Sequence, residues 1–470
     1  MSVASYAPPG ASRVSQYLSL GYIIEITFIC WIFAGVMGKM IPVFFIPAIK
    51  SLRPHYFVAM VMAAMIPLNY MLVKYRFSAK SPAFYSILLW MGFVGVALAS
   101  FGNLLPAKFI FYPRQGSTDL LIVKWFFMLV VLLLFLHFYH AAKERPNLIA
   151  RAVNMLDTSF IYYFLFGWPL YLGVATHKIS LETYSLFTVP GEDLDSLFRF
   201  CPGDYPNGAG EMLAFYIVFL LLMRRNLRFV PIKFMVAIPA LLLTTTRGGI
   251  FPAFAVFGAV MAYIAVMKVG GTNFYRMRLI NILAIAAVVG SIVFLLTVGR
   301  NIEIIAEKMD ILYKGITNVS ESKSVNMRYV NWAIAIRIFF TTLGMGDGFA
   351  QYLETHNLVI ELMAEIGILG TLFFVLFVAV RFMAVFKAYL NRAMGRKGLV
   401  PDFIRFILVA TPVNAFFALT NHNLFHFTFW FLAVATFMIE ARTEKDAVSE
   451  EATAEAPEAL PPPISPAQAT

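Results

Sequence analysis

The chain has 470 residues, of which 60% are hydrophobic, 16% aromatic and only 13% charged. Soluble domains carry about 25% charged and about 45–50% apolar residues, so this composition excludes an ordinary soluble globular protein. The mean hydropathy of +0.76 predicts an all-α polytopic integral membrane protein. The net charge of +11 is typical of nucleic-acid binding when taken alone, so its position along the chain decides its meaning.

Apolar segments near the length of a membrane-spanning helix recur along the chain and predict about twelve spans. They cover residues 18–38, 55–73, 82–101, 118–140, 158–177, 210–223, 230–246, 249–267, 279–299, 358–385, 403–420 and 424–440. The apolar segment 40–49 is too short to cross and contains Pro42 and Pro47, so we interpret it as re-entrant or interfacial.

The basic residues predict the orientation of the spans. Alternate loops carry 20 Lys and Arg residues, whereas the opposite short loops carry eight. Because short cytoplasmic loops are enriched in Lys and Arg, we expect both termini to be cytoplasmic. Lys39, Lys50 and Arg53 are exceptions to this pattern, which leaves the membrane placement of residues 39–54 open. The positive charge therefore sets topology, and nucleic acid is not an expected partner.

The predicted organisation alternates membrane spans with two large periplasmic-side segments. The first is acidic, and the second is a long loop between spans nine and ten. The C-terminal tail is rich in Ala, Glu and Pro and is predicted to be disordered. The units are the cytoplasmic N-terminus 1–17, spans one to nine in 18–299 with the loop 178–209, the loop 300–357, spans ten to twelve in 358–440, and the tail 441–470.

A first polar constellation, residues 244–249 (TTTRGG), separates two apolar segments with almost no loop. Arg247 follows Thr246 and precedes two glycines, so a tight turn holds it at the membrane surface. A guanidinium is always charged and binds phosphate through two parallel hydrogen bonds, which makes Arg247 a candidate phosphate or pyrophosphate ligand. The alternative is an arginine that merely reaches toward water at a helical turn.

A second constellation lies late in the long loop, where residues 328–339 have helical spacing. Arg328, Trp332 and Arg337 fall in this segment, and the glycine-rich residues 343–348 (LGMGDG) should end the helix. Arg328 and Arg337 are candidates to face an anionic ligand. The alternative is an amphipathic helix lying on the membrane surface.

A third constellation begins the tenth span. Asn357 is placed to cap the helix, and Asn357, Glu361 and Glu365 recur every four residues, which puts them on one face. Ionisable groups inside a span are costly and mark a cavity or a partner. His356, whose side-chain type titrates near neutral pH, is a candidate general base. The alternative is a helix cap with an interfacial histidine and carboxylates paired to basic neighbours.

Metal and cofactor chemistry is not indicated by the sequence. Cys30 and Cys201 cannot form a disulfide framework or a cysteine-rich metal site, and no known metal, phosphate-loop or serine-hydrolase motif is present. Weaker polar candidates near the last span are residues 421–423 (NHN) and His426, and Glu25 is a lone carboxylate in the first span. We therefore predict no cofactor and no metal.

Taken in this order, the three constellations resemble the O-antigen ligase and polymerase superfamily. Residues 246–249 resemble its Ser-Arg-Gly turn, Arg328 with the loop 343–348 resembles its second motif, and residues 356–370 resemble its His-Asn segment followed by Glu-x-Gly-x-x-Gly. A further similarity is the Tyr-Pro-Asn sequence that ends at Asn207, although the family has Asn in the first position.

The resemblance implies an enzyme of the bacterial inner membrane that acts at the periplasmic face. It implies transfer of a glycan from an undecaprenyl-pyrophosphate carrier to a sugar hydroxyl, without metal or cofactor. Arg247 and Arg328 would bind the pyrophosphate, and His356 would take the proton of the acceptor hydroxyl. The expected substrate-binding residues are Arg337, Asn357, Glu361, Asn207 and Thr246.

Several alternatives stay open at the level of sequence. A polymerase would extend a lipid-linked chain, whereas a ligase would transfer the glycan to a lipid A-core acceptor, and an exopolysaccharide or a protein acceptor is also compatible. A transporter or flippase of lipid-linked oligosaccharide would instead use Glu25, Glu361 and Glu365 for ion coupling. Location discriminates these classes, because transporters concentrate polar groups near the middle of the membrane.

Overall fold

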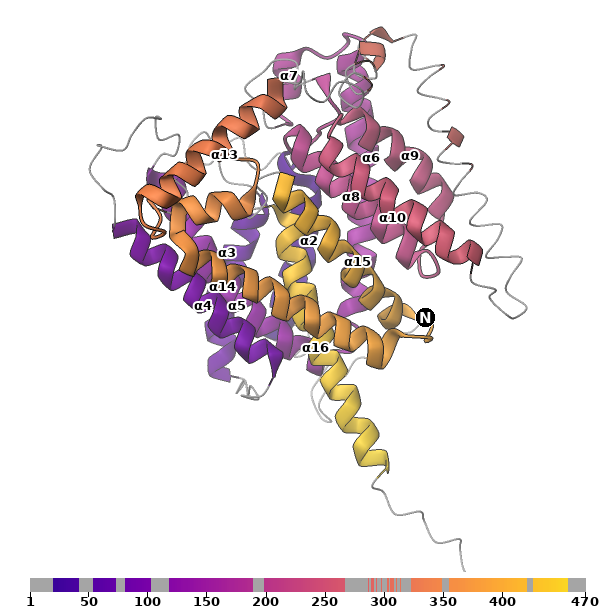
Figure 1. Cartoon of the computed structure of the whole chain (residues 1–470). Helices are drawn as coiled ribbons and strands as arrows, with labels where there is room; N and C mark the ends of the chain where they lie inside the picture. The colour runs from indigo at the N-terminus through magenta and orange to yellow at the C-terminus, as the bar shows by residue number, and fades with distance from the viewer. Residues whose placement is uncertain are drawn as a thin grey trace, which may run out of the picture.

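The computed structural model shows a bundle of helices, and no strand occurs among the residues it describes (Figure 1). The structure describes residues 20–41, 54–72, 81–102, 118–188, 198–266, 323–348, 355–420 and 426–454, with isolated positions between 286 and 313. The helices are α2 (Leu20–Met37), η1 (Gly38–Met40), α3 (Pro54–Leu72), α4 (Pro82–Gly102), α5 (Thr118–Glu144), α6 (Leu148–Ala175), α7 (Leu181–Ser185), α8 (Pro206–Met223), α9 (Val230–Leu243), α10 (Arg247–Val266), α13 (Lys323–Thr341), α14 (Leu358–Ala388), η7 (Tyr389–Ala393), α15 (Leu399–Thr420) and α16 (Phe427–Ala454).

The helices support a polytopic membrane protein. Seven of them, α2, α4, α5, α6, α8, α14 and α15, are long and apolar enough to cross a membrane by length and composition. Every predicted span except 279–299 coincides with a helix, and that segment lies largely outside the described residues. The segment 40–49 also lies outside them, apart from its first two residues. The total of twelve spans stays a prediction.

Two predicted boundaries need correction. The helix α6 begins at Leu148, ten residues before the predicted span, and α16 continues to Ala454. The prediction of a disordered tail from residue 441 is therefore wrong for residues 441–454. Its alanines and glutamates are strong helix formers, and a salt bridge of 3.3 Å from Arg442 to Asp446 joins successive turns. Residues 455–470 lie outside the described residues.

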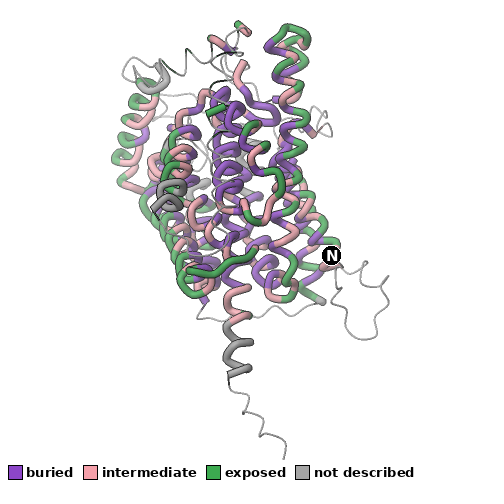
Figure 2. Tube along the Cα trace, turned by 90° about the vertical axis from the view of Figure 1, so that its right-hand side faces the viewer, coloured by how far each residue is buried: buried purple, intermediate pink, exposed green. Residues whose placement is uncertain are grey.

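The centre of the bundle is built from aromatic rings contributed by four helices. Trp90 of α4 meets Trp430 of α16 edge to face at 5.4 Å, and Phe135 of α5 stacks on Phe437 of α16 at 4.7 Å. Phe377 of α14 closes the cluster at 5.0 Å from Trp90. Such ring pairs add stabilisation beyond the area they bury. Figure 2 shows buried residues gathered toward the centre of the bundle and exposed residues mainly at its periphery.

Antiparallel packing of α8 and α15 defines the two ends of the bundle. At one end, Asn414 of α15 donates to Glu211 near the start of α8 at 2.7 Å. At the other end, Asn226 beyond α8 donates to Asp402 near the start of α15 at 2.9 Å. We call the end at Asn414 and Glu211 the site end, because the candidate functional site described below lies there. The end at Asn226 and Asp402 is the opposite end. The helix α16 starts at the site end and finishes at the opposite end (Figure 1).

Several charged groups inside the helices are paired, including the predicted lone carboxylate. Glu25 of α2 binds Arg145, and also Arg151 at 2.6 Å, at the turn between α5 and α6. Deeper in the bundle, Arg381 of α14 binds Glu440 of α16 at 2.5 Å, and both side chains are buried. Because these charges compensate each other, their role is explained by the packing of the bundle.

Removing Arg381 alone should strongly destabilise the bundle. Glu440 would keep only the backbone N–H of Ala83, at 2.7 Å, and would lie buried without a countercharge. We expect Arg381→Met to lower the free energy of unfolding by about 3–5 kcal/mol. Adding Glu440→Met should recover most of this loss. Thermal unfolding in detergent micelles measures both variants, and equal stability of the single and double variants would contradict the pairing.

Candidate functional site

The starts of α8 and α10 lie pressed together at the site end. The hydroxyl of Thr246 donates to the backbone oxygen of Pro206 at 3.0 Å and lies 3.5 Å from Oδ1 of Asn207. The two helices approach too closely for a side chain at Gly249, because a Cβ there would lie 2.7 Å from the backbone oxygen of Gly210. Arg247 is the first residue of α10. Two helix N-termini, which favour anions, therefore lie beside this arginine.

The helix α13 presents Arg328 on its packed face. Arg328, Trp332 and Ala335 lie at positions i, i+4 and i+7, and Ala335 is buried. The indole N–H of Trp332 donates to the backbone oxygen of Thr355 at 2.7 Å, which ties α13 to the segment that carries His356. Arg337 is nine positions after Arg328, about 180° around the helix, and is exposed. The two arginines of α13 therefore do not face a common ligand through one helix face.

The charges of Arg328 and Arg247 act on each other in the folded chain, although 81 positions separate the two residues in the sequence. Burial and the positive charge of Arg247 lower the pKa of Arg328 below its usual value. Among the residues that the structure describes, the buried Nε of Arg328 has no hydrogen-bond partner. Two repelling guanidinium groups with an unused donor, next to two helix N-termini, form a place where a doubly or triply charged anion is strongly favoured.

The predicted cap of α14 is confirmed. Oδ1 of Asn357 accepts hydrogen bonds from the backbone N–H groups of Val359 and Ile360, both at 3.1 Å. The buried hydroxyl of Thr355 lies 2.9 Å from the backbone oxygen of Asn357 and 3.3 Å from Oε2 of Glu361. The half-buried His356 is therefore held between two anchored residues at the start of a long helix.

The glycine-rich loop after α13 is inserted into a break in α14. At Gly367 the backbone of α14 leaves the helical region, with φ of 69°. The freed groups pair with the loop, because Asp347 N–H donates to the oxygen of Ala364 at 2.9 Å and Ile368 N–H donates to the oxygen of Gly344 at 2.9 Å. The second and third constellations are thus joined through their backbones, and Glu365 lies buried at this junction.

Backbone strain marks the same three constellations. Among the described residues, five non-glycine residues have positive φ, and Thr245, Leu343 and His356 are three of them, with φ between 53° and 55°. Such conformations cost about 1–3 kcal/mol each and persist where surrounding structure enforces them. Each constellation therefore holds one strained residue: Thr245 two positions before Arg247, Leu343 at the start of the glycine-rich loop, and His356 itself.

A buried polar network under the start of α8 was not predicted as a site. Nε2 of His426 lies 2.8 Å from Asp204, and its Nδ1 lies 3.0 Å from the hydroxyl of Thr428. Glu211 accepts from Thr428 and from Asn414. The rule that an ionisable residue inside a span marks a site would have found Glu211. Of the residues in this network, the sequence indicates only His426 as a weak candidate. The neighbouring candidates, residues 421–423, lie outside the described residues.

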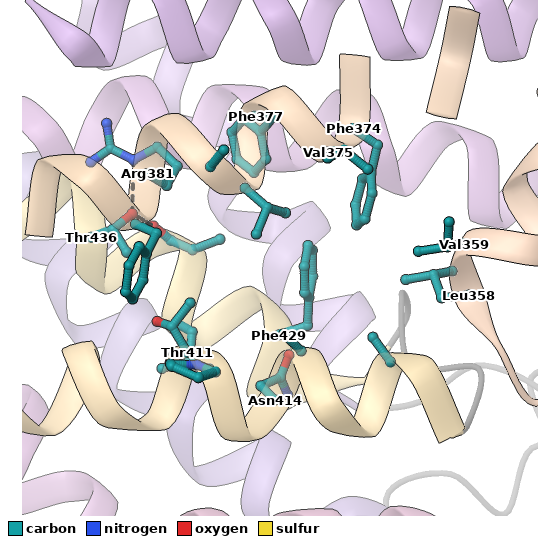
Figure 3. Close-up of a pocket in the computed structure, with 18 of the residues that line it drawn as sticks. Leu358, Val359, Phe374, Val375, Phe377, Arg381, Thr411, Asn414, Phe429 and Thr436 are labelled. Carbon is teal, nitrogen blue, oxygen red and sulfur yellow. Dashed lines mark hydrogen bonds between the residues drawn. The ribbon is translucent and has the colours of Figure 1, made fainter. Parts of the chain in front are cut away.

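An apolar groove of about 450 Å³ begins beside the third constellation. Leu358 and Val359, which directly follow the cap Asn357, line one end, and Arg381 lies at the other (Figure 3). The walls between them come from α14, α15 and α16 and are mainly apolar. The groove also reaches Asn414, a member of the buried network. Its shape suits a hydrocarbon chain that starts at the site end.

The structure brings several of the predicted residues near one another at the site end. The hydroxyl of Thr246 lies near Asn207, and the charge of Arg247 acts on Arg328. Trp332 links α13 to the segment of His356, Asn357 and Glu361, whereas Arg337 lies on the other face of α13. Within the described ranges, no three His, Cys, Asp or Glu side chains are placed to share a metal ion. Comparison with models of protein families and with curated proteins finds no match to this sequence, so the residues themselves carry the functional argument.

Proposed function

We propose that the protein is a membrane glycosyltransferase that moves a glycan from undecaprenyl pyrophosphate to a sugar hydroxyl. The observation that carries this proposal is the approach of Arg247 and Arg328, with an unpartnered Nε on Arg328. A pyrophosphate is a multiply charged anion that suits two guanidinium groups. The resemblance to the O-antigen ligase and polymerase superfamily includes these two arginines, together with residues 356–370.

In the proposed reaction, the acceptor hydroxyl attacks the anomeric carbon of the donor glycan. The bond from this carbon to the pyrophosphate oxygen breaks, and its electron pair leaves with the pyrophosphate. Arg247 and Arg328 stabilise the charge that develops there, as preorganised donors do in other transferases. His356 takes the proton of the attacking hydroxyl. The configuration at the anomeric carbon inverts, and the products are the extended glycan and undecaprenyl pyrophosphate.

The groove supports a lipid-linked donor rather than a soluble one. A long hydrocarbon chain would lie between α14, α15 and α16 and place its charged head at the start of α14. Burial of apolar surface contributes about 25 cal/mol per Å², so a chain that fills the groove adds substantially to donor affinity. The proposed location is the bacterial inner membrane, with the site end facing the periplasm and the basic turns facing the cytoplasm.

Blocking the groove should weaken use of long-chain donors selectively. Val375 lines the groove and Leu372, one turn earlier on α14, does not, although both are partly exposed. We expect Val375→Trp to raise the KM for an undecaprenyl donor about tenfold or more, with little change for a donor with a short prenyl chain. Leu372→Trp is the matched control and should leave both constants unchanged. Equal effects of the two substitutions would show that the groove does not hold the donor.

The contacts of the carboxylates favour this proposal over a transporter or flippase. Glu25 is held by two arginines at the opposite end, and Glu361 lies against the hydroxyl of Thr355 at the site end. Glu25 is therefore already paired with arginines, whereas Arg247, Arg328, His356 and Glu361 lie toward the site end, where a reaction at the membrane surface would need them. A flippase would give movement of lipid-linked glycan across vesicles without release of undecaprenyl pyrophosphate.

The acceptor class is a separate question that a deletion strain can answer. If the protein is a polymerase, loss of the gene should leave single repeat units attached to the lipid A core. If it is a ligase, long chains should accumulate on the lipid carrier. Surface-glycan length, read from an electrophoretic ladder, separates the two outcomes. A normal ladder in the deletion strain would contradict both versions of the proposed function.

A further inference from the structure

Two turns at the opposite end concentrate positive charge. Residues 224–228, between α8 and α9, and residues 389–405, which cover η7 and the start of α15, hold seven cations but a single carboxylate, Asp402. The cations are Arg224, Arg225, Arg228, Arg392, Arg396, Lys397 and Arg405. The turns are more than 150 positions apart in the sequence, so only the fold brings their charges together.

The buried carboxylate of Asp402 holds the two turns side by side. It accepts a hydrogen bond of 2.9 Å from Asn226 in the first turn and pairs with Arg405 in the second. Arg405 also donates to the backbone oxygens of Ala393 and Arg396, which fixes the turn after η7. The carboxylate is therefore already engaged by both turns and cannot neutralise the remaining cations.

Arg224 has an unused donor inside this cluster. Its Nη1 is buried and has no hydrogen-bond partner within the described part of the chain. Burial and the charge of Arg225 lower the pKa of Arg224, although the charge of Asp402 acts in the opposite direction. A guanidinium held beside other cations, with a donor unsatisfied, favours an additional anion at this place.

Exposed apolar side chains surround the cations. Phe229, directly after Arg228, is 71% exposed, and Met394 in the second turn is 63% exposed. Phe229 also has a left-handed backbone, with φ of 54°, and lacks a side-chain cap for α9. A bulky aromatic residue rarely adopts this conformation, so the fold holds the ring outward at a cost. The cluster is therefore suited to a ligand with both an anionic head and hydrocarbon.

The general enrichment of cations in cytoplasmic loops does not explain this arrangement. At the same end of the bundle, residues 143–151 and 440–446 hold five cations and four carboxylates. There Lys143 pairs with Glu444 at 2.7 Å, and Arg442 pairs with Asp446 at 3.3 Å. One pair of segments is thus nearly neutral and internally paired, whereas the other keeps a large excess of positive charge.

We propose that residues 224–229 and 392–397 bind the headgroup of an anionic phospholipid. The phosphate would lie between the two turns, and the acyl chains would pass along Phe229 and Met394 into the surrounding bilayer. Basic pockets between membrane helices bind anionic lipid headgroups in this way. The proposal requires only that the bundle lies in a membrane, and it is independent of glycan transfer.

The test measures lipid retained by the full-length protein in a neutral detergent. Native mass spectrometry would follow titration with phosphatidylglycerol, with phosphatidylcholine and with inorganic phosphate. The variant Arg228→Gln, Arg396→Gln, Lys397→Gln changes three exposed cations, and Lys143→Gln, Arg442→Gln, Lys445→Gln is the matched control at the paired segments. Because each cation near a headgroup contributes about 1 kcal/mol, the first variant should bind phosphatidylglycerol roughly 100-fold more weakly.

The outcomes separate the possible ligands. The wild type and the control variant should prefer phosphatidylglycerol to phosphatidylcholine and should bind inorganic phosphate much more weakly than the lipid. Equal binding of phosphatidylglycerol by the two variants would overturn the assignment to these turns. Equal binding of the two lipids would overturn the role of charge, and binding of inorganic phosphate as tight as that of the lipid would overturn the lipid assignment. An unchanged unfolding temperature for both variants confirms that each is folded.

Discussion

Replacing Arg328 with alanine should lower the rate of glycan transfer by about 10²–10³-fold, the effect seen when one preorganised donor to a developing negative charge is removed. The charge of Arg247 acts on this side chain, and its buried Nε has no hydrogen-bond partner among the described residues. Removing it leaves the pyrophosphate with one guanidinium instead of two. Transfer measured in reconstituted vesicles, with the lipid-linked donor in excess, reports this loss.

The same helix supplies the control for this prediction. Arg337→Ala removes an equal charge from the exposed face of α13 and should change the rate less than about threefold. Arg328→Lys keeps the charge but loses the planar fork, so it should recover only part of the activity. Equal losses in Arg328→Ala and Arg337→Ala would show that charge on the loop, and not the arginine pair, supports transfer.

His356→Ala should lower the rate by about 10²–10⁴-fold, the usual contribution of a general base. Binding of the donor should be retained, because the arginine pair and the groove are untouched. Added imidazole should restore part of the activity by occupying the vacated space. Donor binding in detergent and transfer in vesicles, measured on the same preparation, separate the two effects.

His177 offers a matched control for His356. Both histidines have a left-handed backbone, with φ of 57° at His177 and 55° at His356, but His177 lies in the turn after α6 and is exposed. His177→Ala should leave transfer unchanged. Loss of donor binding in His356→Ala, or absence of rescue by imidazole, would assign His356 a structural role.

The sequence was sufficient for features that depend on local chemistry. Apolar length located nearly every helix, and the side chain of Asn357 caps α14 as its residue type and position predict. The glycines of residues 343–348 end α13 because several of them adopt positive φ. The meeting of Arg247 and Arg328 was expected only from the family resemblance, since nothing in their spacing indicates proximity.

Features that depend on packing between distant parts of the chain could not be predicted from a single sequence. The break at Gly367 exists because the loop at Gly344 supplies hydrogen-bond partners from another part of the chain. The opposite facing of Arg328 and Arg337, in contrast, follows from helical geometry alone, because nine positions turn a helix by about 180°. The network around His426 needed the contact between α8 and α16, which no local pattern reveals.

The most direct test of the central claim is release of undecaprenyl pyrophosphate from a lipid-linked glycan donor by the purified protein in vesicles. The account predicts release that requires both the protein and a sugar acceptor, that continues after metal ions are chelated, and that is lost in Arg328→Ala and His356→Ala but kept in Arg337→Ala. Release that is absent with every acceptor, or equally fast in the Arg328→Ala variant, would contradict the proposed site.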